Sequence, residues 1–304
     1  MCQPTWNQPT SSWRIKDGHW IDLAEPVIMG VVNCTPDSFY DGGRHNELEA
    51  ALRHGQALAS QGALILDVGG ESTRPGSRPV CAQEELERVR PVVRGLSANP
   101  SPVAADGESS AATPVISIDT TKSTVAALCL QAGAAIVNDV SGCRFDPELA
   151  DVLAQYKPGY VLMHAQGSPE SMQQDPRYDN VVDEVRRFFE HRMDTLARSG
   201  LPEEHVVLDP GIGFGKRLEH NLELLRNIEV FQELGRPILV GVSNKSLWKG
   251  LLGLGLEERG TVSQVATALL AARGVRIHRV HDVRATAQAL LVERALRPQG
   301  AWPC

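Results

Sequence analysis

The chain has 304 residues, of which 42% are hydrophobic, and a formal net charge of -7 at pH 7. This length can bury a full-sized core and suits one large α/β domain or two smaller ones. A large nucleic-acid surface normally appears as a basic domain or stripe, so the acidic balance argues against nucleic acid and favours a small-molecule partner.

The sequence also indicates where the protein is located in the cell and whether its cysteines form disulfides. No stretch approaches the roughly 18 uninterrupted apolar residues of a membrane helix, and the first residues lack the regions of a signal peptide. No C-x-x-C pair occurs among the six scattered cysteines, Cys2, Cys34, Cys81, Cys129, Cys143 and Cys304. We therefore expect a cytoplasmic protein with free thiols and no membrane segment.

From residue 27 onward, short β-branched runs alternate with longer stretches of helical period, a pattern typical of βα units. The predicted strands are Val27 to Asn33, Ala63 to Val68, Val115 to Asp119, Ala135 to Asp139, Tyr160 to His164, His205 to Asp209, Pro237 to Gly241 and Arg276 to Val280. Helices are expected near residues 47–61, 83–97, 122–132, 147–156, 180–199, 219–234, 262–273 and 282–296. Eight such units predict a (β/α)8 TIM barrel, with a doubly wound open sheet as the alternative.

The predicted barrel spans residues 27–297, between an N-terminal extension of residues 1–26 and a C-terminal tail of residues 298–304. Within the extension, WRIKDGHWIDL at residues 13–23 has two apolar runs around an Asp-Gly turn. This pattern predicts a β-hairpin that covers the barrel floor.

One segment inside the barrel does not fit a strand or a helix. Residues 97–113, SANPSPVAADGESSAAT, are rich in Ser, Ala and Pro. We expect a mobile surface insertion on the αβ side of the barrel, far from the active site.

Polar side chains recur where the predicted strands end. Acids or amides stand there, directly before turn-prone loops, at Asn33, Asp67, Asp119, Asn138, Asp139 and Asp209. In a barrel these positions meet at the C-terminal rim, where active sites of this fold lie. A single such residue would more simply cap the helix or turn that follows it. Recurrence in five loops, with Lys245 in a sixth, favours a binding site instead.

The composition of this rim indicates the chemistry of its ligand. Buried carboxylates need hydrogen-bond donors, and a pyrimidinone edge with an exocyclic amine would offer them to Asp119, Asn138 and Asp209. Lys245 could donate to a ring oxygen or nitrogen. From the residues alone, the prediction is a heteroaromatic or polar ligand.

The last predicted strand supplies two basic residues. Arg279 and His281 are two positions apart, so at strand period they can face the same way and hold a phosphate or diphosphate. The alternative is that Arg279 pairs with a neighbouring carboxylate while His281 caps the last helix. The remaining histidines, including His164, show no ligand spacing and are interpreted as structural.

The glycine-rich segment GIGFGKR, after Asp209, is superficially similar to a phosphate-binding loop. It is one residue short of G-x-x-x-x-G-K-[ST] and has Arg217 where Ser or Thr is required. The segment also lacks the G-x-G-x-x-G spacing of dinucleotide-binding folds. We therefore expect no nucleotide cofactor.

From about residue 27 to 292 the sequence resembles the dihydropteroate synthase family. The matching segments are MGVVNCTPDSFYDGG from Met29, DVGGESTRPGS from Asp67, ISIDTTK from Ile116, IVNDVSG from Ile136, LMHAQGSPESMQ from Leu162, LDPGIGFGK from Leu208, VGVSNKS from Val240 and RVHDV from Arg279. The family joins 6-hydroxymethyl-7,8-dihydropterin diphosphate to p-aminobenzoate in folate biosynthesis and is a target of sulfonamides. The resemblance thus implies a transferase, and a homodimer built from outer helices.

The resemblance also implies roles for individual residues. Pterin binding is implied for Asp119, Asn138, Asp209, Phe214, Lys245 and Arg279. Diphosphate binding is implied for Asn33, Arg279 and His281, with Mg²⁺ placed at Asn33. Binding of p-aminobenzoate is implied for Phe39, Asp41, Thr73, Arg74, Pro75 and Ser246. Catalysis, by loss of diphosphate before the amine attacks, is implied for Asn33, Lys245, Arg279 and His281.

Three positions depart from the family pattern. Asn244 stands where an arginine is common, Ala165 where a methionine often follows the histidine, and Cys34 where a valine is usual. Two alternatives therefore remain open. One is a pterin-dependent methyltransferase on the same barrel, which should lack the TPDSF and STRPG loops; the other is a catalytically silent pterin-binding paralogue, which Asn244 favours.

Overall fold

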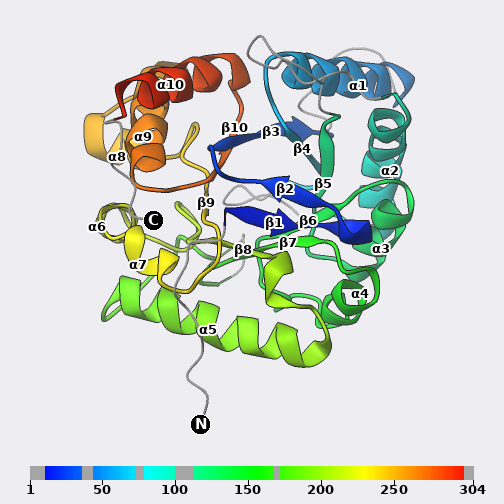
Figure 1. Ribbon diagram of the computed structural model, residues 1–304, viewed down its shortest axis with the longest axis horizontal. Coiled ribbons are helices and arrows are strands. Elements are labelled where there is room, and N and C mark those ends of the chain that lie inside the picture. Colours follow the sequence, from blue (N-terminus) through cyan, green and yellow to red (C-terminus); the bar gives the residue numbers. More distant parts are fainter. Residues whose placement is uncertain (1–10, 36–43, 73–78, 100–112, 168–170, 298–304) are drawn as a thin grey trace.

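The computed structural model describes residues 11–35, 44–72, 79–99, 113–167 and 171–297 as a barrel of parallel strands surrounded by helices (Figure 1). The eight strands follow the order β8-β7-β6-β5-β4-β3-β10-β9. Their bounds are β3 Val27–Asn33, β4 Ile65–Gly69, β5 Val115–Asp119, β6 Ile136–Asp139, β7 Gly159–Met163, β8 Val206–Asp209, β9 Leu239–Val240 and β10 Ile277–Val280. A parallel bridge between Leu208 and Ile238 joins the two ends of this order. The predicted (β/α)8 barrel is confirmed, and the open-sheet alternative is wrong.

The helices form a ring outside the strands (Figure 1). Their bounds are α1 Arg44–Ser60, α2 Ala82–Ala98, α3 Ser123–Gln131, α4 Leu149–Tyr156, α5 Val181–Ser199, α6 Leu218–Arg226, α7 Glu229–Gln232, α8 Leu247–Leu252, α9 Gly260–Ala272 and α10 Val283–Leu296. α5 illustrates how local sequence sets these bounds. Asn180 caps its N-terminus by accepting from the backbone N–H of Val182 and Asp183, and Gly200 ends it in the left-handed region.

Two helical expectations need correction. The single helix expected at residues 219–234 is divided into α6 and α7 at Asn227, whose side chain donates to the carbonyl of Glu223 at 2.9 Å. Such a local side-chain bond competes with helical backbone bonding. The short helix α8 was not expected at all, because six residues are too few to show a helical period.

The predicted N-terminal hairpin is present and covers the barrel floor. β1 (Ser12–Arg14) pairs antiparallel with β2 (Trp20–Asp22), and in Figure 1 the pair crosses the middle of the ring. Trp13 is fully buried and donates through Nε1 to the carbonyl of His205 at 2.7 Å. With Ile21 it packs against side chains from the barrel strands, including Ile65 and Ile136. The floor is therefore filled largely with apolar side chains.

The register of the strands brings their polar C-terminal residues together at the end of the barrel opposite the hairpin. Gly69 of β4 pairs with Asp119 of β5, and Asp119 pairs with Asn138 of β6. Further round, Met163 of β7 pairs with Asp209 of β8. Because parallel strands all point the same way, these residues lie on the C-terminal rim, as predicted.

Two further expectations concern the surroundings of the barrel. Most of the predicted surface insertion at residues 97–113 lies outside the described residues. Within the described part of the chain, no helix is both long and apolar enough to cross a membrane.

Candidate functional site

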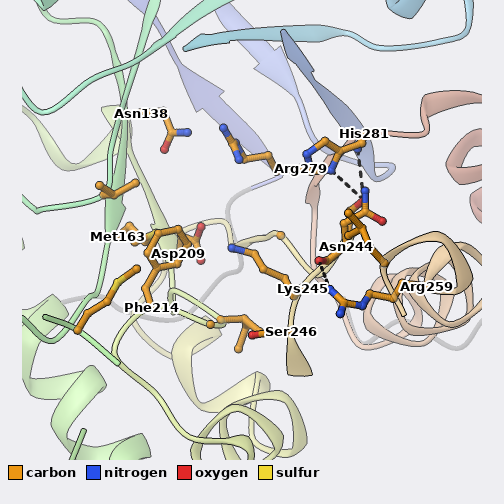
Figure 2. Close-up of a pocket in the computed structure, with 17 residues that line it drawn as sticks. Asn138, Met163, Asp209, Phe214, Asn244, Lys245, Ser246, Arg259, Arg279 and His281 are labelled. Atoms are coloured by element: carbon orange, nitrogen blue, oxygen red, sulfur yellow. Dashed lines mark hydrogen bonds between the residues drawn. The ribbon is translucent and has the colours of Figure 1, made fainter. Parts of the chain in front are cut away.

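A pocket of about 320 Å³ opens at the C-terminal rim (Figure 2). The volume lies in the range of small-molecule sites. Seven of the predicted site residues line it, namely Asn138, Asp209, Phe214, Lys245, Ser246, Arg279 and His281. They come from β6, β8 and β10 and from the loops that follow β8, β9 and β10, so the structure brings together residues that are far apart in the sequence.

Lys245 supplies the positive charge on one side of the pocket. Figure 2 shows its side chain pointing from the loop after β9 toward Asp209 and Phe214. Its ammonium lies 4.0 Å from the centre of the Phe214 ring, within cation–π range. Burial, together with the nearby guanidinium of Arg279, lowers the pKa of Lys245 to about 8. A poorly solvated donor of this kind favours a ligand that offers it an acceptor.

Asp209 supplies an acceptor next to Lys245. Its Oδ1 accepts from the backbone N–H of Gly211 at 2.7 Å, so the carboxylate also braces its own loop. Burial raises the pKa of Asp209, although this hydrogen bond and the charge of Lys245 oppose the shift. The interpretation that Asp209 caps its own turn is therefore confirmed, and its role in binding a ligand stays a prediction.

Arg279 lies between two buried carboxylates. Its Nε donates to Asp67 Oδ2 and its Nη2 to Asp119 Oδ2, each at 2.7 Å. Burial opposes the charge of the guanidinium, but the two carboxylates outweigh it and raise the pKa of Arg279. Pairing with carboxylates was the alternative interpretation of this residue, and it is correct. Arg279 still lines the pocket, so pairing does not remove it from the site.

The pKa of the Asp119 carboxyl group is shifted by its surroundings. Burial raises its pKa to about 7, the charge of Arg279 opposes the shift, and the charge of Asp67 adds to it. Asp119 is 9% exposed and is not among the residues that line the pocket; its Oδ2 accepts from Arg279, which does line it.

The remaining predicted anion ligands, His281 and Asn33, differ in whether they line the pocket. His281 lines the pocket and its Nδ1 lies 3.1 Å from the hydroxyl of Ser243. It does not cap the last helix, since Asp282 accepts from the backbone N–H of Ala285 there. Asn33 is half-buried at the end of β3 and does not line the pocket.

Most of the predicted p-aminobenzoate residues, Phe39, Asp41, Thr73, Arg74 and Pro75, lie outside the described residues. The described ends of the second loop are tightly held. Glu71 accepts from the backbone N–H of Val80 at 3.1 Å and also pairs with Lys122, which in turn pairs with the fully buried Glu85. Ser246 is exposed, directly before α8.

Two of the three positions that depart from the family pattern lie at or beside the pocket, whereas the half-buried Cys34 directly follows β3. Asn244 has φ of 58°, in the left-handed region that asparagine tolerates well. Its carbonyl accepts from Nη1 of the buried Arg259 at 3.0 Å, so a cation from another loop reaches this turn. Ala165 is buried behind the pocket with Met163 and Phe214, and it does not line the pocket.

Lys216 holds the glycine-rich loop that follows β8 in its conformation. Its buried ammonium donates to the carbonyls of His164, Gly211 and Phe214 at 3.0 to 3.1 Å, and lies 3.0 Å from His164 Nδ1. Gly211 has φ of +68°, and a Cβ there would lie 1.9 Å from the carbonyl oxygen of His164. The loop therefore closes around its own lysine and packs on the end of β7, which matches the structural role predicted for His164.

Comparisons with known proteins agree with this geometry. Residues 29–281 match the family described as "Pterin binding enzyme". The chain belongs to the pterin-binding enzyme family. Within it, the chain is 40% identical over 278 residues to the dihydropteroate synthase of Escherichia coli, covering 91% of this chain and 94% of that one. It is 42% identical to the Synechocystis dihydropteroate synthase over 270 residues, 88% of this chain and 89% of that one.

Solved structures from the same family are equally similar. Xanthomonas albilineans dihydropteroate synthase with 4-aminobenzoic acid has a TM-score of 0.84 and 40% identity, over 96% of this chain and all of that one. The same enzyme with 7,8-dihydropteroate has a TM-score of 0.81 and 38% identity, over 95% and 100%. The fold of this family therefore extends over nearly the whole chain.

Sequence reasoning missed three residues that the structure places at or beside the site. Asp67 was noted at a strand end but given no role, although its position alone was a usable signal. Lys216 stands in the glycine-rich loop that we did not assign to phosphate binding. Nothing in this motif indicates that the lysine donates to backbone carbonyls. Arg259 is far along the chain and has no motif that links it to Asn244.

We predict that Lys216→Met lowers the free energy of unfolding by about 1 to 3 kcal/mol, since three buried carbonyls lose their donor. Pterin affinity should also fall, by roughly ten-fold, because Phe214 and Asp209 share the loop that Lys216 fixes. Urea unfolding and calorimetry measure the two effects, with the exposed Lys249→Met as the matched control. A variant as stable as the parent, with the parent's affinity, would contradict this role for Lys216.

Proposed function

We propose that the chain is a dihydropteroate synthase, which joins 6-hydroxymethyl-7,8-dihydropterin diphosphate to p-aminobenzoate and releases diphosphate in folate biosynthesis. The observation that carries this proposal is the rim pocket, in which Lys245, Asp209 and Asn138 present one cation and several acceptors around a shared cavity. The relatives at about 40% identity support the same reaction class, a transferase.

Recognition of the pterin follows from the donors and acceptors in the pocket. The aminopyrimidinone edge carries N–H donors, which suit the carboxylates of Asp209 and Asp119 and the amide oxygen of Asn138. Lys245 would donate to an acceptor of the pterin ring, and its ammonium is held 4.0 Å from the centre of the Phe214 ring. Arg279 lies beside Asp119, where its guanidinium can pack along the face of the pterin.

The diphosphate is assigned to Asn33, Arg279 and His281 on the rim. Arg279 and His281 line the pocket and come from β10 and the position directly after it, so both reach the same side. The amide oxygen of Asn33 fits Mg²⁺, because this ion takes few protein ligands and completes its shell with water and substrate phosphate. When bound, Mg²⁺ would neutralise charge that develops on the departing diphosphate.

The reaction proceeds by loss of diphosphate before the amine attacks. Arg279 and His281 stabilise the anion that leaves, and the pterin methylene carbon becomes electron-deficient. The nitrogen lone pair of p-aminobenzoate then forms the new C–N bond, and the nitrogen releases a proton to solvent. We place this amine opposite the diphosphate, with Ser246 receiving its carboxylate and Phe39, Asp41, Thr73, Arg74 and Pro75 completing its pocket.

Two alternatives were left open by the sequence. A methyltransferase on the same barrel is disfavoured by the presence of the TPDSF and STRPG segments. A silent paralogue is favoured only by Asn244, and the nearby Arg259 retains a cation at that turn. Active synthase is therefore the better interpretation.

Condensation by the purified protein with Mg²⁺ tests the function directly. We expect steady diphosphate release from the parent and a loss of roughly ten- to a hundred-fold or more in Lys245→Ala, because a charge-assisted contact to the pterin is removed. Asn244→Arg should change turnover only a few-fold, since Arg259 already contacts this turn. Lys249→Ala, on the exposed surface of α8, serves as the control.

The outcome that would favour the silent paralogue is a parent no faster than Lys245→Ala. Recovery of turnover in Asn244→Arg would strengthen that conclusion. The assay thus distinguishes an inactive protein from an active synthase whose turnover Asn244 has changed.

We also propose that the protein is a cytoplasmic homodimer that associates through α9 and α10. Large apolar side chains are exposed on these two neighbouring helices, at Val265, Leu269, Leu291, Val292 and Leu296. Several exposed large apolar side chains on two neighbouring helices are typical of an interaction site. The four cysteines in the described part of the chain are free, which suits a reducing compartment.

Leu269→Asp should weaken the dimer, because it places a charge at a side chain that is 62% exposed in the single chain and would be buried on association. Analytical ultracentrifugation at micromolar concentration should show a dimer for the parent and a monomer for the variant. Trp20→Asp, at an exposed apolar residue of the floor hairpin, should remain dimeric. A monomeric parent would refute the dimer, and a dimeric Leu269→Asp would refute its placement on α9.

A further inference from the structure

We propose that Asp67 is a positioning residue of the pterin site, which orients both Asn138 and Arg279 through one carboxylate oxygen. This inference rests on the proposed function, because it concerns how the same site receives its pterin. Asp67 lies in β4 and is completely buried. It does not line the pocket, so it acts through its neighbours.

The contacts of Asp67 determine which atoms Asn138 presents. Oδ2 of Asp67 accepts from Nδ2 of Asn138 at 2.9 Å. Because an ionised carboxylate only accepts hydrogen bonds, the amide must turn its NH2 group toward Asp67. The amide oxygen of Asn138 is thereby left as the acceptor for a donor on the ligand.

The same oxygen also sets the plane of Arg279. It accepts from Arg279 Nε at 2.7 Å, while Asp119 holds Nη2 at the same distance. Two anchoring points fix a planar guanidinium, whereas one leaves it free to rotate. Without Asp67, Arg279 would be held by Asp119 alone, at one end.

The cost of burying Asp67 indicates that it is more than a packing residue. Its second oxygen, Oδ1, is buried and has no hydrogen-bond partner among the described residues. A fully buried charged group is costly even when it is paired, and apolar side chains of similar size can fill the same space at lower cost. The charge is therefore best explained by what it does to the site.

The negative charge of Asp67 also affects the pKa of Asp119. Burial, with the negative charges of Asp67, Glu85 and Asp139, raises the pKa of Asp119 to about 7 against the opposing charge of Arg279. Lys245 is the other cation that faces this carboxyl group. Because the pKa is raised, the carboxylate that accepts pterin N–H groups is present above about pH 7 and is lost as the pH falls through that value.

Two substitutions separate the charge of Asp67 from its geometry. Asp67→Asn keeps an oxygen that can accept from both neighbours, so pterin affinity above pH 8 should stay within a few-fold of the parent. Removing the negative charge lowers the pKa of Asp119, so the acid limb of the affinity profile should move down by about one pH unit. Asp67→Ala removes the acceptor, and affinity should fall roughly ten- to a hundred-fold at every pH.

Calorimetric titration with a dihydropterin between pH 5.5 and 9 measures these effects, and the KM for p-aminobenzoate at saturating pterin should not change. Asp151→Asn, an exposed carboxylate on α4, is the control for loss of one negative charge. If Asp67→Ala does not fold, the acid limb of Asp67→Asn decides the question.

Parent-like affinity in Asp67→Ala, or an unmoved acid limb in Asp67→Asn, would overturn the role of Asp67 while leaving the proposed function intact. A parent that binds no pterin would overturn both.

Discussion

The site depends on one constraint, the pairing of the partly buried Arg279 with two buried carboxylates at the mouth of the barrel. A guanidinium in this position needs paired charges, and Asp67 and Asp119 provide them from adjacent strands. The pairing fixes where the cation stands and which oxygens remain for a ligand. It also raises the pKa of Arg279 and leaves the pKa of Asp119 near 7, since burial of Asp119 outweighs the attraction of Arg279.

The rest of the barrel supports this arrangement from two directions. The hairpin fills the floor with Trp13 and its apolar neighbours, whereas the acids and amides at the strand ends lie on the rim. On the rim, Lys216 and the glycines around it hold the loop of Asp209 and Phe214 against the end of β7. A pterin would thus meet groups whose positions are set before it arrives, which reduces the entropy lost on binding.

Period and strand-end chemistry predicted the barrel, the floor hairpin and five residues that line the pocket, and the family resemblance added Phe214 and Ser246. These succeeded because βα alternation and the C-terminal rim follow from local pattern and from a general property of the fold. The break at Asn227 and the short α8 were missed, since a side-chain bond and a six-residue helix leave no periodic signal. Asp67, Lys216 and Arg259 act through contacts with residues distant in sequence or with backbone carbonyls, which composition and spacing do not encode.

Calorimetry with a dihydropterin ligand, comparing the parent with Asp209→Ala, tests the central claim most directly. The claim is that buried acceptors on the rim receive the pterin edge. Asp209→Ala should lose affinity by about a hundred-fold, because a charged acceptor is removed from a water-poor pocket. Asp151→Ala, with its exposed carboxylate, should bind like the parent. Affinity of Asp209→Ala within a few-fold of the parent, in a protein that remains folded, would contradict the account.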